Sequence, residues 1–333
     1  MATDMLIRQR PAGSSAAALT TSIVEARTRD APLVGHSIDR PQRSRSARAT
    51  RKQSLTDASP EVVLCDHRGV GVWDRGELRY VRDSRGDERP YWSGQSWQLG
   101  TARFWEETCR QASVSGHYRL GENLRDEILA CVLGGYGVRW SAVSPYIERI
   151  RESGALARDV VAIDELRLLL TEPVLIDGRW QRYRFPNQRA RRLSSALNAV
   201  CEREYSKLGD LELRDALMLI EGIGPKTASW VVRNHRASDR VAIIDIHIAR
   251  AGIVAGVFDP AWDVNRHYLD FEAAFLSWSQ SVGLSAAALD SVIWGYLAGD
   301  EAWAKDVLGV DSYSNVALRP VWPPEMAPGN VQS

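Results

Sequence analysis

The segment Leu219–Val232 constrains the fold of this chain more than any other. It reads Leu-Ile-Glu-Gly-Ile-Gly-Pro-Lys-Thr-Ala-Ser-Trp-Val-Val. A helical pattern upstream stops at Gly222, a three-residue turn follows, and Pro225 suits the first position of a second helix. Glycine at 222 and 224 allows backbone angles or close approaches that a Cβ would forbid. The segment therefore predicts two helices joined by a tight turn, with Ile223 pointing inward between them.

Such a turn presents the free backbone amides of the second helix to solvent. Amides at a helix N-terminus bind anions, and phosphate contacts of this kind do not read base sequence. A Gly-x-Gly turn also occurs in ordinary helical hairpins, so the turn alone leaves both interpretations open. Lys226 lies in the first turn of the new helix, where the helix macrodipole disfavours a cation. Three roles are open for Lys226: a nucleophilic amine, a phosphate contact or a simple solvated lysine.

An isolated carboxylate follows nineteen residues after Lys226. The run Val-Ala-Ile-Ile at 241–244 leads to Asp245, after which another apolar helical pattern begins. Asp is a preferred N-cap residue, so a purely structural role is open. A catalytic role is compatible with it, because one carboxylate oxygen can cap the helix while the other faces a cleft. His247 is either a core histidine or a phosphate ligand at the start of that helix.

The rest of the chain predicts a mainly α protein with a small N-terminal β element. Short strands are expected at 62–64, 70–73 and 77–81, joined by glycine-containing turns. A loop with Trp92 and Trp97 follows, and beyond it the apolar spacing is helical. We expect four regions: a disordered basic tail, a small β and loop element, a helical domain and a C-terminal tail, at residues 1–60, 61–105, 106–310 and 311–333.

Composition limits the partner and the compartment. Cations and acids number 42 each, which taken alone argues against a nucleic-acid-binding protein. The balance is uneven, however, because residues 1–60 hold ten cations against five acids, and the remainder holds 32 against 37. Four scattered cysteines exclude a dense disulfide framework and fit a reducing compartment. No apolar run approaches the length of a membrane span, so no membrane association is expected.

Together these motifs resemble the helix-hairpin-helix DNA glycosylase superfamily, and most closely its 8-oxoguanine DNA glycosylase/AP lyase branch. Gly222–Lys226 resembles the hairpin with lysine at the nucleophile position, and Ile244–His247 resembles the segment with the family's Asp and phosphate-binding His. Tyr183–Arg191 is similar to the Arg-Phe…Lys/Arg-Ala-Arg stretch of the smaller prokaryotic enzymes. Leu124–Tyr136 is similar to the helix that leads to the DNA-wedging loop. The resemblance covers roughly residues 100–300.

The resemblance implies a two-subdomain fold and a DNA glycosylase with AP lyase activity. Its substrate would be an oxidised purine such as 8-oxoguanine in double-stranded DNA. Lys226 would form a Schiff base with the sugar, and Asp245 would stabilise the positive charge that develops there. DNA contacts fall on Gly222, Ile223, Gly224, Thr227 and His247, and the wedge or base pocket on Tyr136, Arg139 and Trp230. We expect a monomer in the cytoplasm, associated with the nucleoid.

This chain departs from the family pattern at two places. The iron–sulfur cysteines of the endonuclease III branch are absent after residue 250, so neither that cluster nor another metal is expected, while a monovalent cation at the hairpin stays open. The loop Gly134–Gly137 lacks the polar residues that the family inserts beside the extruded base. Three alternatives therefore remain: a glycosylase of the same fold acting on another modified base, a catalytically silent DNA-binding module, and a helical protein–protein adaptor.

Overall fold

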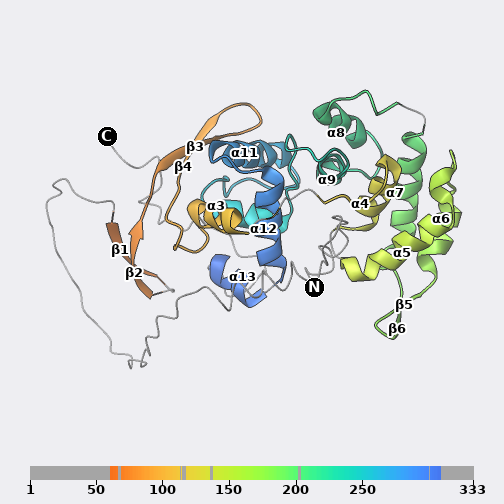
Figure 1. Cartoon of the computed structure of the whole chain (residues 1–333), viewed down its shortest axis with the longest axis horizontal. Helices are drawn as coiled ribbons and strands as arrows, with labels where there is room; N and C mark the ends of the chain where they lie inside the picture. Colours follow the sequence, from red (N-terminus) through yellow and green to blue (C-terminus); the bar gives the residue numbers. More distant parts are fainter. Residues whose placement is uncertain are drawn as a thin grey trace.

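A computed structural model describes residues 61–66, 69–112, 114, 118–135, 138–201, 204–299 and 301–308 (Figure 1). The two predicted tails and Tyr136 lie outside these residues. Within them the chain is mainly helical with short antiparallel strands near its start, which confirms the predicted fold class.

The N-terminal strands form two hairpins. Strand β1 (Glu61–Asp66) pairs with β2 (Gly69–Asp74), and β3 (Leu78–Arg82) pairs with β4 (Glu88–Trp92). The predicted strands at 62–64 and 70–73 fall within β1 and β2, and the one at 77–81 overlaps β3, so all three are confirmed. Strand β4 lies where the sequence predicted a loop, and that prediction is wrong. Pro90 explains the error, because proline weakens a strand pattern yet is tolerated where its missing N–H faces no partner strand.

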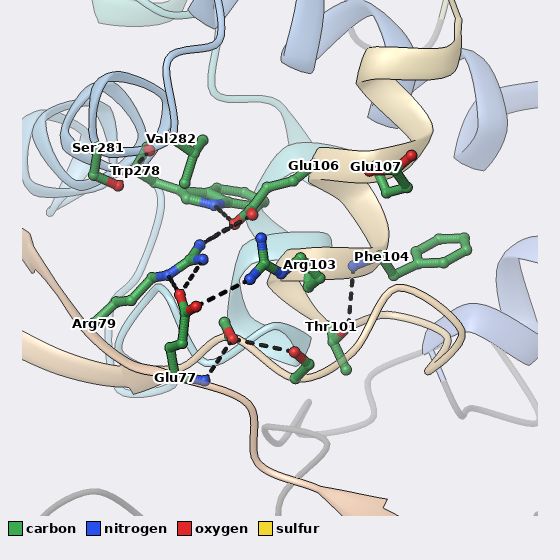
Figure 2. A network of polar contacts seen from close by, with 12 residues as sticks. Glu77, Arg79, Thr101, Arg103, Phe104, Glu106, Glu107, Trp278, Ser281 and Val282 are labelled. Carbon is green, nitrogen blue, oxygen red and sulfur yellow. Dashed lines mark hydrogen bonds and ion pairs between the residues drawn. The ribbon is translucent and has the colours of Figure 1, made fainter.

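A polar network around a buried carboxylate joins the second hairpin to the helices (Figure 2). Arg79 of β3 forms ion pairs with Glu77 at 2.5 Å and with Glu106 at 3.0 Å. Glu106 lies on α3 (Ala102–Gln111), is fully buried, and also accepts a hydrogen bond from Trp278 Nε1 at 2.9 Å on α11 (Tyr268–Ser281). A buried carboxylate without partners would be costly. The network therefore fixes β3 against α3 and α11.

The helices divide between two hydrophobic cores (Figure 1). The second core holds β3, β4, α3 and α11 together with the helices of the C-terminal part, α10 (Ile246–Val254), α12 (Ala286–Gly299) and α13 (Glu301–Leu308). The first core holds the central helices, namely α4 (Leu124–Leu133), α5 (Trp140–Glu152), α6 (Ile163–Thr171), α7 (Pro186–Ala199), α8 (Asp210–Met218) and α9 (Pro225–Arg236). Two cores within one chain agree with the predicted pair of subdomains.

The connection between α9 and α10 belongs to both cores. Val241 and Ile243 pack in the first core, whereas Ala242 and Ile244 pack in the second. This alternation is what an extended backbone produces, because its successive side chains point to opposite sides. The segment therefore runs between the subdomains and delivers the next residue, Asp245, to their boundary.

A further hairpin interrupts the helical region. Strands β5 (Val174–Ile176) and β6 (Arg179–Gln181) pair between α6 and α7, so the expectation of helices alone beyond residue 105 is wrong here. Asp177 and Gly178 both have positive φ, 49° and 74°. Positive φ at both central residues is typical of the two-residue turn that Asp-Gly favours in hairpins.

No single helix among the described residues is long and apolar enough to cross a membrane. The bent pair Tyr268–Ser281 and Ala286–Ala298 meets the length and composition of a span only when its two helices, 107° apart, are taken together.

Candidate active site at the boundary of the two cores

The predicted turn between two helices is confirmed. Helix α8 ends at Met218, Gly224 is the N-cap of α9, and Pro225 is its first residue. Ile223 is buried, and its N–H donates to Ile220 O at 3.1 Å. The first amides of α9 have no carbonyl partner within the helix, so this turn carries the donors that an anion would need.

Gly222 is required in this turn for two reasons. Its φ is +88°, a conformation that side chains other than glycine rarely adopt. A Cβ there would also lie 2.3 Å from Cγ of Arg192, a residue of α7. The arginine stem thus lies directly against the turn, and it brings a cation to the edge of the amide-rich surface.

One face of α9 carries three side chains toward the boundary between the cores. Lys226, Trp230 and Arg233 are spaced at i, i+4 and i+7, which places them on the same side of a helix. Lys226 Nζ lies 6.0 Å from the centroid of the Trp230 ring. The ring is buried and packs against Gly134 at the C-terminal end of α4, where a Cβ would lie 3.2 Å from the indole. Trp230 therefore separates Lys226 from the start of the predicted wedge loop.

Asp245 caps α10 with one carboxylate oxygen. Its Oδ1 accepts from His247 N–H at 2.8 Å and from Ile248 N–H at 3.0 Å. Its Oδ2 forms no hydrogen bond with any described residue. The structure thus confirms the predicted cap and leaves the second oxygen available to a ligand.

A second carboxylate and an arginine complete the cluster, and neither was predicted from the sequence to have a role. Asp290 of α12 is buried and pairs with Arg233. Burial raises the pKa of Asp290 to about 7, Asp245 acts in the same direction, and Arg233 and Lys226 oppose them. The charges on α9, α10 and α12 thus act on one another, although the three helices are far apart in the sequence.

His247 lies in the same electrostatic environment. Burial lowers the pKa of His247, with Arg250 and Lys226 acting in the same direction and Asp245 against them. Its Nδ1 is buried and has no hydrogen-bond partner among the described residues. A buried ring nitrogen without a partner is unusual in a folded protein, and it fits a histidine whose partner is a ligand.

Two buried glutamates fix the helices around the site relative to one another. Glu272 of α11 accepts from Ser229 Oγ at 2.7 Å and from Ala242 N–H at 3.1 Å, and it pairs with Arg214 of α8. Asn234, next to Arg233, donates to the fully buried Glu127 of α4 at 2.8 Å. These contacts tie α9 to both cores and to the segment that precedes Asp245, so the position of Lys226 relative to Asp245 is set by the fold.

The structure brings most of the predicted residues to one place. Lys226, Asp245, His247 and Trp230 lie in the cluster, and the turn residues with Thr227 lie at the N-terminal end of the same helix. Arg139 is exposed at the start of α5. Within the described part of the chain, no group of three or more His, Cys, Asp or Glu side chains is placed to hold a metal ion.

A match to a protein family indicates the class of enzyme to which this site belongs. Residues 156–284 match a family model described as 8-oxoguanine DNA glycosylase, a range that includes the turn, Lys226, Asp245 and His247 but stops before Asp290. Over these residues the sequence matches the helix-hairpin-helix DNA glycosylases. This glycosylase is accordingly an enzyme of the DNA glycosylase/lyase class.

Solved structures of the superfamily resemble this glycosylase. The 8-oxoguanine DNA glycosylase of Methanocaldococcus jannaschii is 24% identical, with 59% of this chain and 84% of that chain covered and a TM-score of 0.41. The 8-oxoguanine DNA glycosylase of Thermotoga maritima is 22% identical, with 60% and 91% covered and a TM-score of 0.41. A trapped covalent complex of endonuclease III with DNA is 17% identical, with 58% and 83% covered and a TM-score of 0.43. No curated protein matches the chain closely enough to count as a relative.

Proposed function

We propose that this glycosylase excises an oxidised purine of the 8-oxoguanine type from double-stranded DNA and then cleaves the strand through a Schiff base on Lys226. The observation that carries the proposal is that Lys226, at the N-terminus of the helix after the turn, lies in one cluster with Asp245, which keeps one carboxylate oxygen free. The neighbouring turn supplies amides for phosphate beside the lysine. We further propose that the enzyme acts as a monomer on nucleoid DNA in the cytoplasm.

The first step is access to the base. A base within a duplex is out of reach, so the nucleotide must rotate out of the stack into the enzyme. The turn around Gly222 would hold the backbone next to the lesion through its amides, assisted by Arg192 and His247. These contacts involve phosphate only, which lets the enzyme grip any sequence.

The second step exchanges one bond at the sugar for another. The neutral amine of Lys226 attacks C1′ while the bond from C1′ to the base breaks, and the base leaves with the electron pair and takes up a proton. Positive charge develops on the sugar during this exchange, as in other glycosidic cleavages. The free oxygen of Asp245, held by the cap, would stabilise that charge electrostatically.

The third step breaks the strand. Loss of a proton from the lysine nitrogen and opening of the sugar ring give a protonated imine between Nζ and C1′. The imine makes the proton on C2′ acidic, and its removal expels the phosphate on the 3′ side. Water then hydrolyses the imine and returns free Lys226.

The decisive experiment is borohydride trapping with Lys226→Gln. Wild-type protein should form a covalent adduct with a duplex carrying 8-oxoguanine, and Lys226→Gln should form none and release no base. Lys207→Gln is the matched control, since Lys207 is solvent-exposed and, among the described residues, forms an ion pair with Glu204 alone. An adduct on Lys226→Gln would show that another residue is the nucleophile.

One observation supports a second candidate function. The large Trp230 ring lies beside Lys226. It leaves less space for a base next to the amine than a small residue at this position would leave. This favours a glycosylase of the same fold that acts on another modified base. A panel of duplexes with single lesions, scored for base release and for nicking, decides between the two. Binding without release on every duplex would instead indicate a catalytically silent module.

A further inference from the structure

The hairpin of β5 and β6 exposes an aromatic side chain that does not pack in either hydrophobic core. Trp180 is 73% exposed, and its cross-strand partner Leu175 is 57% exposed. Residues directly opposite in a ladder lie on the same face, so the two form one apolar patch. Tryptophan is large and contributes heavily when a partner covers it. The patch therefore has the character of a contact surface.

Three hydrogen bonds connect the hairpin to α5 and the chain that leaves the hairpin to α4. The Tyr146 hydroxyl of α5 donates to Gln181 O at 3.0 Å, which fixes the end of β6. Two residues further on, the Tyr183 hydroxyl donates to Leu133 O at 2.6 Å, and Arg189 donates to Val132 O at 2.8 Å. The chain that leaves the hairpin thus lies against the C-terminal end of α4, where the predicted wedge loop begins.

The same stretch leads on to the phosphate-binding turn. It enters α7, and α7 carries Arg192, whose stem packs on Gly222. The hairpin, the end of α4 and the turn are therefore linked by successive contacts. These contacts join the hairpin, through α7, to the turn that we propose holds DNA.

The charge around Trp180 favours a nucleic acid over a protein partner. Arg179 and Arg182 flank it, are exposed, and form no ion pair with any described residue. Arg184 is exposed as well and lies over the Phe185 ring. Aromatic side chains interleaved with cations are typical of surfaces on which nucleobases stack while the phosphates are neutralised.

We propose that the β5–β6 hairpin is a second DNA contact of this glycosylase, in which Trp180 stacks on an unpaired nucleobase near the lesion and Arg179 and Arg182 contact phosphates. An intact duplex offers no free base face, because its bases already stack on one another. Extrusion of the lesion leaves its former partner unpaired. The proposal rests on the proposed function for this extrusion, but not on the chemistry of Lys226.

Binding to an uncleavable abasic-site analogue tests the hairpin. Trp180→Ala should weaken binding to a duplex with this analogue by about tenfold or more, as expected for one lost base–aromatic stack, and change binding to an intact duplex little. Leu168→Ala is the matched control, since Leu168 is 70% exposed on α6 of the same core. Trp180→Phe should restore part of the loss, because it keeps an aromatic face. Thermal unfolding of all three variants checks that the fold is unchanged.

The arginines give a separate readout. Replacing Arg179 and Arg182 with Gln should reduce the slope of log K against log salt by about 2, since each phosphate contact contributes about 0.9. Arg85→Gln, on the turn between β3 and β4, should leave the slope unchanged.

Three outcomes would overturn the proposal. The first is that Trp180→Ala binds the abasic duplex as tightly as wild type does. The second is that Trp180→Ala loses as much affinity for the intact duplex as for the abasic duplex. The third is that wild type forms dimers, which Trp180→Ala dissociates while DNA binding is unchanged. The last would assign the patch to a second copy of the chain. Failure of the proposed function is seen separately, because the trapping test of Lys226 uses neither the hairpin nor the abasic analogue.

Discussion

Asp245 has two roles that a pair of substitutions separates. Its Oδ1 accepts hydrogen bonds from two backbone amides of α10, while its Oδ2 is free to face a substrate. Asparagine caps helices about as well as aspartate, so Asp245→Asn keeps the cap and removes the charge. Asp245→Ala removes both.

The two variants should differ in stability. Loss of an N-cap costs about 0.5–2 kcal/mol, whereas loss of only the charge–dipole interaction costs about 0.3–1 kcal/mol. Asp245→Ala should therefore unfold at a lower urea concentration than Asp245→Asn. In a domain of this size, 1 kcal/mol corresponds to about 2–4 °C in Tm.

The same variants should lose catalysis equally. Removing one group that stabilises transition-state charge costs about 10²–10³ in rate, and both variants remove it. Single-turnover release of 8-oxoguanine measures this loss, and binding to an uncleavable abasic duplex measures affinity on the same samples. Wild-type excision by Asp245→Asn would refute the electrostatic role and leave Asp245 as a helix cap. A loss of affinity as large as the loss of rate would refute the separation itself.

Two further predictions concern the turn and the buried acid. Gly222→Ala should lower the free energy of unfolding by about 1–2 kcal/mol for its left-handed backbone alone, and weaken DNA binding as Arg192 is displaced. Gly224→Ala is the matched control, because a Cβ there meets nothing within 4 Å; equal urea midpoints would contradict the argument. The pKa of Asp290 is raised from 3.8 to about 7 in the folded protein. Between these two values the carboxyl ionises in the unfolded chain but not in the folded one, so a rise in pH lowers the stability of the folded state. The free energy of unfolding of wild type minus that of Asp290→Asn should fall between pH of about 4 and about 8, by up to about 4 kcal/mol; a difference independent of pH would contradict it.

The parts of the site that sequence analysis predicted are those set by local chemistry. The turn at Gly222, the start of α9 at Pro225 and the cap at Asp245 each depend on residues within one helical turn. Their backbone requirements are visible in the residues themselves: a positive φ, a missing N–H and a short acceptor side chain. The structure confirms all three.

The parts that sequence analysis missed depend on packing between distant elements. Asp290 stands in an apolar helical run, and nothing in that run indicates that α12 faces Arg233 of α9. The sequence did contain a local signal for Arg233, since Lys226, Trp230 and Arg233 share one helical face. The β5–β6 hairpin also had a local signal, Asp177-Gly178, which the surrounding helical pattern outweighed. A two-residue turn signal is more specific than the helical spacing of short apolar segments.

The excess of acids in residues 61–333 does not weigh against DNA binding, because the acids and the cations are placed differently. Glu106, Glu127, Glu272 and Asp290 are buried, and each is held by a cation or by hydrogen-bond donors. Arg179 and Arg182, by contrast, lie exposed beside the candidate DNA surface. Charges buried in internal pairs contribute little to the field that a phosphate meets outside, whereas exposed cations act on it at contact distance. Affinity for DNA should therefore follow the few arginines of this surface and the amides of the turn, and the net charge should affect mainly the rate of approach at low salt.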